Sequence, residues 1–416
     1  MAIARSRRRS LDDPELPSSK RPRVLGDHPR HQLSSSRRDW SNLGEGPAGL
    51  VADRLLANDV ADYIRFRAVC SPWRQSSTDP RAHGILDRRF HPRKWIMLRE
   101  THDHHRRLLN VSTGQCILMP HLKKLLRGHD VFGPTTEGLL VLLHRSSYVV
   151  RLLNPLTGHT ANLPPATTLL RFMEQKFSPT ADHRTRFQVS DAGLADDSTF
   201  AVNFYGIQML TVAKPGDECW TLVEVQGSSV LPASSISFEG RFYCPTNQGV
   251  MVVETSADQP PRLVLAAELA KEFPHMLSTV HLVDNGREMI MVYRTVSGSG
   301  TNSWTYDAYR VDLKAMNTRS VLELGGRAIF IGYRSTVSVS TSVFPSLKSD
   351  SIYLGLDDDM LYEDRLHCLT DGTTELSGIF EHGGFDEEYG SAIPSKFGPW
   401  GIDDFLSWYV TELEDE

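Results

Sequence analysis

The chain has 416 residues, of which 40% are hydrophobic and 23% are charged, and this balance is that of a globular protein. The length exceeds one ordinary domain, so we expect two units or one large all-β unit. No apolar stretch approaches the ~18 to 20 residues that span a bilayer, and we therefore expect no membrane partner.

Cysteine usage predicts an intracellular protein, and the charge is unevenly distributed along the chain. The formal net charge is −6, yet residues 1–38 carry ten Lys and Arg against four Asp and Glu, so a basic tail precedes an acidic body. The five cysteines are widely spaced and form no CxxC pair, which predicts reduced thiols rather than disulfides or a zinc ribbon. We expect the protein in the nucleus, the cytoplasm or both.

Residues 1–38 form the first predicted segment, a disordered basic tail. They are rich in Arg, Ser, Pro and His and contain too few large apolar side chains to fold alone. Two basic clusters with ten residues between them resemble a bipartite nuclear-localisation signal, whose main residues are Arg7, Arg8, Arg9, Lys20, Arg21 and Arg23. The alternative is a solvated arm. Specific nucleic-acid binding is not expected, because no basic patch with interleaved aromatic residues follows.

Residues 39–78 predict a small helical module. Ser41 or Asn42 can cap a first helix that has Pro47 as its first residue. Asp59 is a plausible N-cap for a second helix, and Ser71-Pro72 begins a third. A module of this size is marginally stable alone, so we expect it to bury one face against another part of the chain or a partner.

The end of this module, Arg65-Phe66-Arg67-Ala68-Val69-Cys70-Ser71-Pro72-Trp73-Arg74, resembles an F-box, a module that docks onto the Skp-type adaptor of a cullin-based ubiquitin ligase. One departure is that the Leu-Pro pair of F-box proteins is here Leu43-Gly44, with a proline only at position 47. The resemblance implies that the adaptor-binding residues are Trp40, Leu43, Pro47, Leu50, Leu55, Leu56, Ile64, Phe66, Arg67, Val69, Cys70, Trp73 and Arg74.

After a predicted linker at 79–94, short Val-, Ile- and Tyr-rich runs separated by Gly, Pro, Asn and Asp predict a β domain over 95–411, with an acidic tip at 412–416. A single segment, 261–273, could be helical. The strands group into repeated units that suit a β-propeller, with a β-sandwich pair as the alternative. The predicted units span 95–120, 132–164, 186–226, 236–266, 278–324 and 329–380.

Three sequence motifs in the β region indicate the family more specifically. They are Leu153-Asn154-Pro155-Leu156-Thr157-Gly158, Ala213 to Trp220, and Tyr309 to Leu313 followed by Gly325 to Gly332. Together with the F-box-like module in front, they resemble the plant F-box family that carries a KIB-type β-propeller, formerly domain of unknown function 295. The expected fold is therefore mainly β with a small α module, in which N-terminal F-box helices precede a C-terminal β-propeller-like domain.

No residue pattern in the chain predicts catalysis. The cluster His102 to His105 and the run Asp357 to Asp359 are best explained as polar loops, since neither has the full ligand set of a zinc or calcium site. No nucleophile elbow, phosphate-binding loop or HExxH motif occurs. We expect no catalytic residue, no metal and no cofactor, although an enzyme with residues gathered at a propeller channel remains an open alternative.

These observations favour a substrate-recognition adaptor of a Skp-cullin-F-box-type E3 ubiquitin ligase. Its expected partners are the Skp-type adaptor, the cullin and an unidentified protein substrate held by the propeller. Such a subunit acts by proximity, because it raises the concentration of a target lysine near the conjugating enzyme. The alternative is a regulatory protein that sequesters a partner through the propeller, and Leu43-Gly44 is the feature that favours it.

Overall fold

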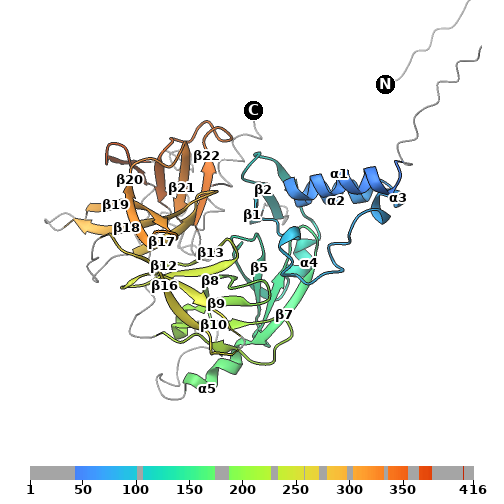
Figure 1. Cartoon of the computed structure of the whole chain (residues 1–416), viewed down its shortest axis with the longest axis horizontal. Helices are drawn as coiled ribbons and strands as arrows, with labels where there is room; N and C mark the ends of the chain where they lie inside the picture. The colour runs from blue at the N-terminus through green and yellow to red at the C-terminus, as the bar shows by residue number, and fades with distance from the viewer. Residues whose placement is uncertain are drawn as a thin grey trace, which may run out of the picture. The chain divides into compact units, whose positions relative to one another are not determined.

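The computed structural model describes one compact unit that begins at Leu43. Within this unit the described residues are 43–100, 106–173, 187–225, 233–256, 258–270, 279–297, 303–331, 336–354, 365–376 and Leu406 (Figure 1). No helix in this part of the chain is long and apolar enough to cross a membrane. The predicted basic tail and Trp40 lie outside the described residues.

Three helices come first in the described part of the chain: α1 (Glu45–Asn58), α2 (Val60–Val69) and α3 (Ser71–Gln75). The predicted cap of α2 is confirmed, because the Asp59 side chain accepts a hydrogen bond from the Ala61 N–H at 2.6 Å. Pro72 lies in the first turn of α3, as predicted. The predicted start of α1 is wrong: Gly44 occupies the N-cap position with φ of 75°, and Pro47 is the third helical residue. A proline is tolerated there because the first turn leaves its N–H groups unpaired.

The strands of the first half form three antiparallel sheets, ordered β1-β2-β3, β4-β5-β6-β7 and β11-β10-β9-β8. Their bounds are β1 (Trp95–Glu100), β2 (Arg106–Asn110), β3 (Cys116–Leu118), β4 (His129–Phe132), β5 (Leu140–His144), β6 (Val149–Leu153), β7 (Thr160–Pro165), β8 (Val189–Leu194), β9 (Phe200–Phe204), β10 (Met209–Ala213) and β11 (Thr221–Leu222). Short helices connect them: η2 (Arg88–Phe90), α4 (Leu122–Leu126), η3 (Ala166–Leu169), α5 (Leu170–Met173) and η4 (Tyr205–Ile207).

The strands of the second half form a nine-stranded and a five-stranded sheet. Their bounds are β12 (Ala233–Ser234), β13 (Ile236–Phe238), β14 (Arg241–Pro245), β15 (Gly249–Glu254), β16 (Arg262–Glu268), β17 (Thr279–Asp284), β18 (Met289–Ser297), β19 (Ser303–Asp312), β20 (Asn317–Val321), β21 (Arg327–Ile331), β22 (Thr336–Ser340), β23 (Ser351–Leu354), β24 (Arg365–Cys368) and β25 (Thr374–Leu376).

The nine-stranded sheet consists of two antiparallel runs of four strands and the short strand β12, which pairs in parallel with β17. Strands β13 to β16 form one run and β17 to β20 the other, and a single parallel pair, Glu268 with Asn317, joins them. When the two runs of the nine-stranded sheet are counted separately, each strand run covers nearly the same residues as one of the units predicted from the repeats. They are less uniform than expected, since the first sheet has three strands and the last has five, with β21 parallel to β23.

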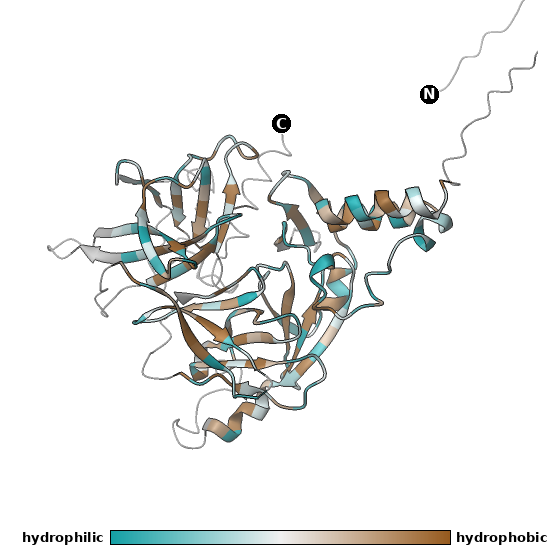
Figure 2. Cartoon of the chain, viewed as in Figure 1, coloured by the Kyte–Doolittle hydropathy of each residue, from teal (hydrophilic) through white to brown (hydrophobic). Residues whose placement is uncertain are grey.

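Apolar clusters connect each strand run with the next, and one cluster connects the last run with the first. Most strand residues are hydrophobic, as expected of strands covered on both faces (Figure 2). One cluster combines Ile96 and Leu109 of the first sheet with Phe330 and Leu366 of the last, and Leu406 lies within it. Since the other clusters connect each run with the next, the sheets pack as a closed cycle. This closure confirms the predicted mainly β, propeller-like fold.

Two segments differ from what their local sequence predicts, because tertiary contacts determine their structure. The predicted helix at 261–273 is wrong over its described part, because Arg262–Glu268 is strand β16 and pairs with β15. Residues 79–94, predicted as a linker, pack firmly against the sheets. Ile85 and Leu86 belong to the core between the second and third sheets, and Phe90 belongs to the core of the helices.

Candidate functional site

The three helices have an apolar interior of their own. Ala48 in the first half of α1 packs in one cluster with Phe66 in the second half of α2, so the two helices run antiparallel. The rings of Phe66 and Trp73 stack with centroids 4.7 Å apart, and Tyr63 packs against Phe90 at 6.0 Å. Phe66 is only 4% exposed. These aromatic residues therefore hold the module together from within.

The structure divides the predicted adaptor-binding residues into two groups. The inner group packs inside the module or toward the first sheets: Leu43, Leu55, Leu56, Ile64, Phe66 and Trp73. Cys70 is half-buried at the end of α2. Pro47, Leu50, Val69 and Arg74 are exposed. The exposed residues are open to a partner, the buried Phe66 supports the helices from within, and the other members of the inner group are only partly buried.

The two arginines predicted at the rim of the adaptor contact hold the helices in place. The Arg67 guanidinium donates hydrogen bonds to the Ser77 hydroxyl at 2.9 Å and to the Arg74 carbonyl at 3.1 Å. Arg74 Nε donates in return to the Arg67 carbonyl at 3.1 Å. Arg67 also lies 3.4 Å from the Asp79 carboxylate. This network ties α2 to the chain that follows α3.

Three large apolar side chains of the helices, Leu50, Val51 and Val69, are exposed. These side chains are 72%, 45% and 62% exposed. Leu50 and Val51 lie in the first half of α1, and Val69 is the last residue of α2, so the antiparallel packing places them at the same end of the pair. These apolar side chains are therefore available to contact a partner without rearrangement of the helices.

The other side of the helices is fixed to the first sheet. The Asp59 carboxylate accepts hydrogen bonds from Trp95 Nε1 at 3.1 Å and from Asn110 Nδ2. Lys94 Nζ donates to the Asn58 carbonyl at 2.7 Å. Val60 and neighbouring residues of α2 share an apolar cluster with Trp95. The helices and the sheets are therefore joined by specific contacts rather than by a flexible tether.

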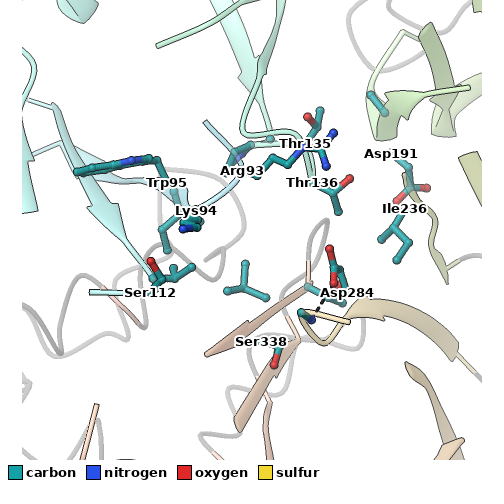
Figure 3. A pocket seen from close by; sticks show the side chains of 18 of the residues that line it. Arg93, Lys94, Trp95, Ser112, Thr135, Thr136, Asp191, Ile236, Asp284 and Ser338 are labelled. Atoms are coloured by element: carbon teal, nitrogen blue, oxygen red, sulfur yellow. Dashed lines mark hydrogen bonds between the residues drawn. The ribbon is translucent and has the colours of Figure 1, made fainter. Parts of the chain in front are cut away.

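A second candidate site is a central channel of about 630 Å³. Residues from all the strand runs line it, and Figure 3 shows their side chains converging from opposite sides. The polar side chains include many hydroxyls, together with the charged residues Arg93, Lys94, Asp191, Asp284 and Arg327. Such a mixed lining can bind a polar group through hydrogen bonds, but it presents no arrangement specific for one reaction.

Burial dominates the electrostatics of this channel. It raises the pKa of Asp191 to about 7, and it also raises the pKa of Asp284 above its usual value. The same desolvation lowers the pKa of Arg327, whose Nε donates to Ser338 Oγ at 2.8 Å. These residues carry no local sequence signal, because they are far apart in the chain and only the folding of the sheets brings them together.

No metal site occurs in the part of the chain that the structure describes, where no group of three or more His, Cys, Asp or Glu side chains could hold an ion. The predicted polar loops at His102 to His105 and Asp357 to Asp359 lie outside the described residues. So do Trp40 and the predicted nuclear-localisation residues.

Comparison with known proteins gives a family match for most of the chain. A family model described as the KIB1-4 beta-propeller matches residues 118–381. A search of curated proteins finds no match.

The similarity to three solved structures is distant. Virginiamycin B lyase from Staphylococcus aureus is 10% identical with a TM-score of 0.30, over 59% of this chain and 68% of the lyase. The dihydro-heme d1 dehydrogenase NirN is 12% identical with a TM-score of 0.28, over 59% of this chain and 55% of NirN. The Cps50 (Swd1) beta-propeller domain of Myceliophteria thermophila is 11% identical with a TM-score of 0.25, over 55% of this chain and 85% of that domain. These scores are too low to inform function.

Proposed function

This chain belongs to the KIB1-4 beta-propeller family, and from that premise we propose that it is the substrate-recognition subunit of a Skp-cullin-F-box-type ubiquitin ligase. In this proposal the helices at 45–75 are an F-box that binds the Skp-type adaptor, and the propeller binds the protein substrate. The chain supplies no catalytic group. It acts by holding a target lysine close to the charged conjugating enzyme that the cullin recruits.

The observation that carries the adaptor proposal is the exposure of the apolar side chains Leu50, Val51 and Val69 on the helices. Leaving such side chains in water is unfavourable by roughly 1.5 to 3 kcal/mol for each one that a partner could bury fully. The helices that present them are held rigid by the Phe66 and Trp73 stack and by the arginine network, so binding would require little ordering of the helices.

Co-purification of the full chain with a Skp-type adaptor tests this proposal. We expect a stoichiometric complex with wild type, and its loss in the variants Leu50→Glu and Val69→Glu, because each places a charge in the middle of the buried contact. Leu322→Glu is the matched control, since Leu322 is a comparably exposed residue, at 61%, on the propeller. An adaptor complex that survives both helical substitutions would refute this assignment.

Ile64 and Trp73 are unsuitable positions for the same test. Ile64 packs against the cluster that joins α2 to the first sheets, and Trp73 stacks on Phe66. A charge at either position would disturb the fold of the helices, so loss of adaptor binding would not distinguish a contact from a structural effect.

A second function, sequestration of a partner without ligase activity, is favoured by one observation. Gly44 replaces the proline expected beside Leu43 and has φ of 75°, a value that proline cannot adopt. The chain therefore enters α1 differently from an F-box that starts with Leu-Pro. Failure of wild type to bind any Skp-type adaptor, together with stable capture of a protein by the propeller, would support this alternative.

We also propose that the basic tail directs nuclear import. The support is the spacing of its two basic clusters, with Arg7 to Arg9 in the first and Lys20, Arg21 and Arg23 in the second. A fluorescent protein fused to residues 1–38 should accumulate in the nucleus, and replacement of both clusters by alanine should abolish this. Equal distribution of the two fusions would contradict the proposal.

A further inference from the structure

The charges of the central channel are unevenly distributed. Asp284 is influenced by two nearby cations, Arg327 and Arg93. The ammonium group of Lys94 donates to the Asn58 carbonyl at 2.7 Å and is thereby engaged at the helices. Asp191, on a different strand run, is 5% exposed and forms no ion pair with the described residues, and the largest influences on its ionisation are burial and hydrogen bonds from neutral groups. The channel therefore contains one buried carboxylate without a countercharge among the described residues.

Neutral donors hold the Asp191 carboxylate in the channel wall. Its Oδ1 accepts a hydrogen bond from the Ser235 N–H at 3.0 Å, and its Oδ2 accepts from Ser190 Oγ at 3.1 Å and from Asn203 Nδ2 at 3.3 Å. These bonds connect β8 with β9 and with the start of β13. They fix the position of the carboxylate but supply no positive charge, so ionisation of Asp191 remains costly.

A second polar group, the Ser235 hydroxyl, lies at the same place. Ser235 lines the channel and is 6% exposed. Its hydroxyl lies close enough to Asp191 and Cys244 to lower the pKa of each, but it makes no well-formed hydrogen bond in the described part of the chain. The apolar residues Val189 and Ile236 line the channel next to Asp191 and Ser235 in the sequence. Figure 3 shows Asp191 and Ile236 on one side of the channel and Asp284 with Ser338 on another. A ligand group that is cationic, donates hydrogen bonds and ends an apolar chain matches these features.

We propose that the Asp191 side of the channel binds a protonated amine or guanidinium group, supplied by a free small molecule or by a lysine or arginine side chain of a bound protein segment. The cation would pair with the Asp191 carboxylate in a site of low dielectric, and a remaining N–H would donate to Ser235 Oγ. Methylene groups of the ligand would contact Val189 and Ile236. This site is independent of the adaptor contact on the helices.

Binding at this site should depend on pH in a defined direction. Because burial raises the pKa of Asp191 to about 7, the carboxylate is mostly protonated at pH 6 and mostly ionised at pH 8. The thiol of Cys244 on β14 faces it and stays neutral, since burial raises the pKa of that thiol to about 12. An alkylamine stays protonated throughout this range, so its affinity should rise about tenfold from pH 6 to pH 8. The other charged residues of the channel and its adjoining loop are Arg93, Lys94, Glu137, Asp284 and Arg327.

Isothermal titration calorimetry on the full chain tests the proposal. The probes are 1,4-diaminobutane as the free amine and an acetylated Gly-Lys-Gly amide as the side chain, and the neutral controls are 1,4-butanediol and the same peptide acetylated on its lysine. We expect at least one amine to bind and neither neutral control to bind. Binding of the diamine alone identifies a small-molecule site, and binding of the peptide alone identifies a site for a partner's side chain.

Two variants assign the binding to Asp191. Asp191→Asn keeps the size of the side chain and one acceptor, and should lower the amine affinity at pH 8 by about tenfold or more. Asp284→Asn should bind nearly as wild type does. Amine affinity that is unchanged in Asp191→Asn, or neutral controls that bind equally well, would overturn the proposal. Should Asp191→Asn fail to fold, the pH series of wild type decides, because an affinity that does not rise between pH 6 and pH 8 contradicts a role for this carboxylate.

Discussion

Removal of the Asp59 side chain should loosen the helices from the first sheet. In the folded chain this carboxylate caps α2 through the Ala61 N–H and accepts hydrogen bonds from Trp95 Nε1 and Asn110 Nδ2. Trp95 and Asn110 are 2% and 1% exposed, so water cannot easily replace the lost acceptor. Asp59→Ala therefore removes three hydrogen bonds and leaves two buried donors unsatisfied.

The expected loss of stability follows from these contacts. A lost N-cap costs about 1 kcal/mol, and each unsatisfied buried donor costs about 1 to 3 kcal/mol. Because neighbouring effects are not additive, we expect a total of about 3 to 5 kcal/mol. Asp59→Ser should recover about 1 kcal/mol of this loss, since a serine hydroxyl can still cap α2 but is too short to serve the two donors on the first sheet.

Urea unfolding followed by tryptophan fluorescence measures the total loss, and hydrogen exchange locates it. Amides of α1 to α3 should lose protection in Asp59→Ala while those of the propeller strands keep theirs. Asp62→Ala is the control on the same helix, because Asp62 forms an exposed ion pair with Arg65 that contributes little. If the free energies of unfolding of Asp59→Ala and Asp62→Ala differ by less than about 0.5 kcal/mol, then the Asp59 carboxylate does not join the helices to the sheet in the way described.

Three further predictions follow from burial and backbone geometry. Gly138→Ala should lower the free energy of unfolding, measured with urea, by more than about 2 kcal/mol, on the order expected for backbone strain. The reason is that φ is +80° at this position and a Cβ would lie 2.2 Å from the Pro92 carbonyl oxygen. A loss near zero would contradict this prediction. Phe66→Ala should cost about 3 to 5 kcal/mol and Leu50→Ala less than about 0.5, and similar losses would refute their assignment as inner and exposed residues. Since the pKa of Asp191 is raised above its unfolded value, the folded chain binds the proton more tightly, and this residue's contribution to stability should fall as pH rises from about 4 to 7. Thermal unfolding of wild type and Asp191→Asn over this range should show wild type losing stability relative to the variant, and parallel curves would contradict the shift.

Local sequence signals predicted those features that depend on neighbouring residues. Asp59 was identified as the cap of α2 because a short carboxylate before an apolar helical run can accept the first free N–H groups. Pro72 was placed at the start of α3 for a related reason, since its missing N–H is not needed there. The strand runs were located from apolar runs between turn residues, and the structure has them at nearly the predicted positions.

Features that depend on distant contacts were predicted poorly. Residues 262–268 have a composition compatible with a helix, yet they form β16 because β15 offers a paired edge along their length. Phe66 is buried inside the helices while Leu50 is exposed, and apolar identity alone does not distinguish the two, because it does not reveal which side chains a second helix will cover. The channel residues Asp191 and Asp284 carried no local signal at all.

The sequence by itself determined the mainly β class, the short helices that precede the sheets and the family of the propeller, because these depend on periodicity, turn residues and motifs that can be read along the chain. Tertiary structure alone decided which apolar residues of the helices remain exposed, how Asp59 joins them to the first sheet, and which charges meet in the channel. The physical reason is that burial and desolvation depend on what packs against a residue, and its partners come from distant parts of the chain.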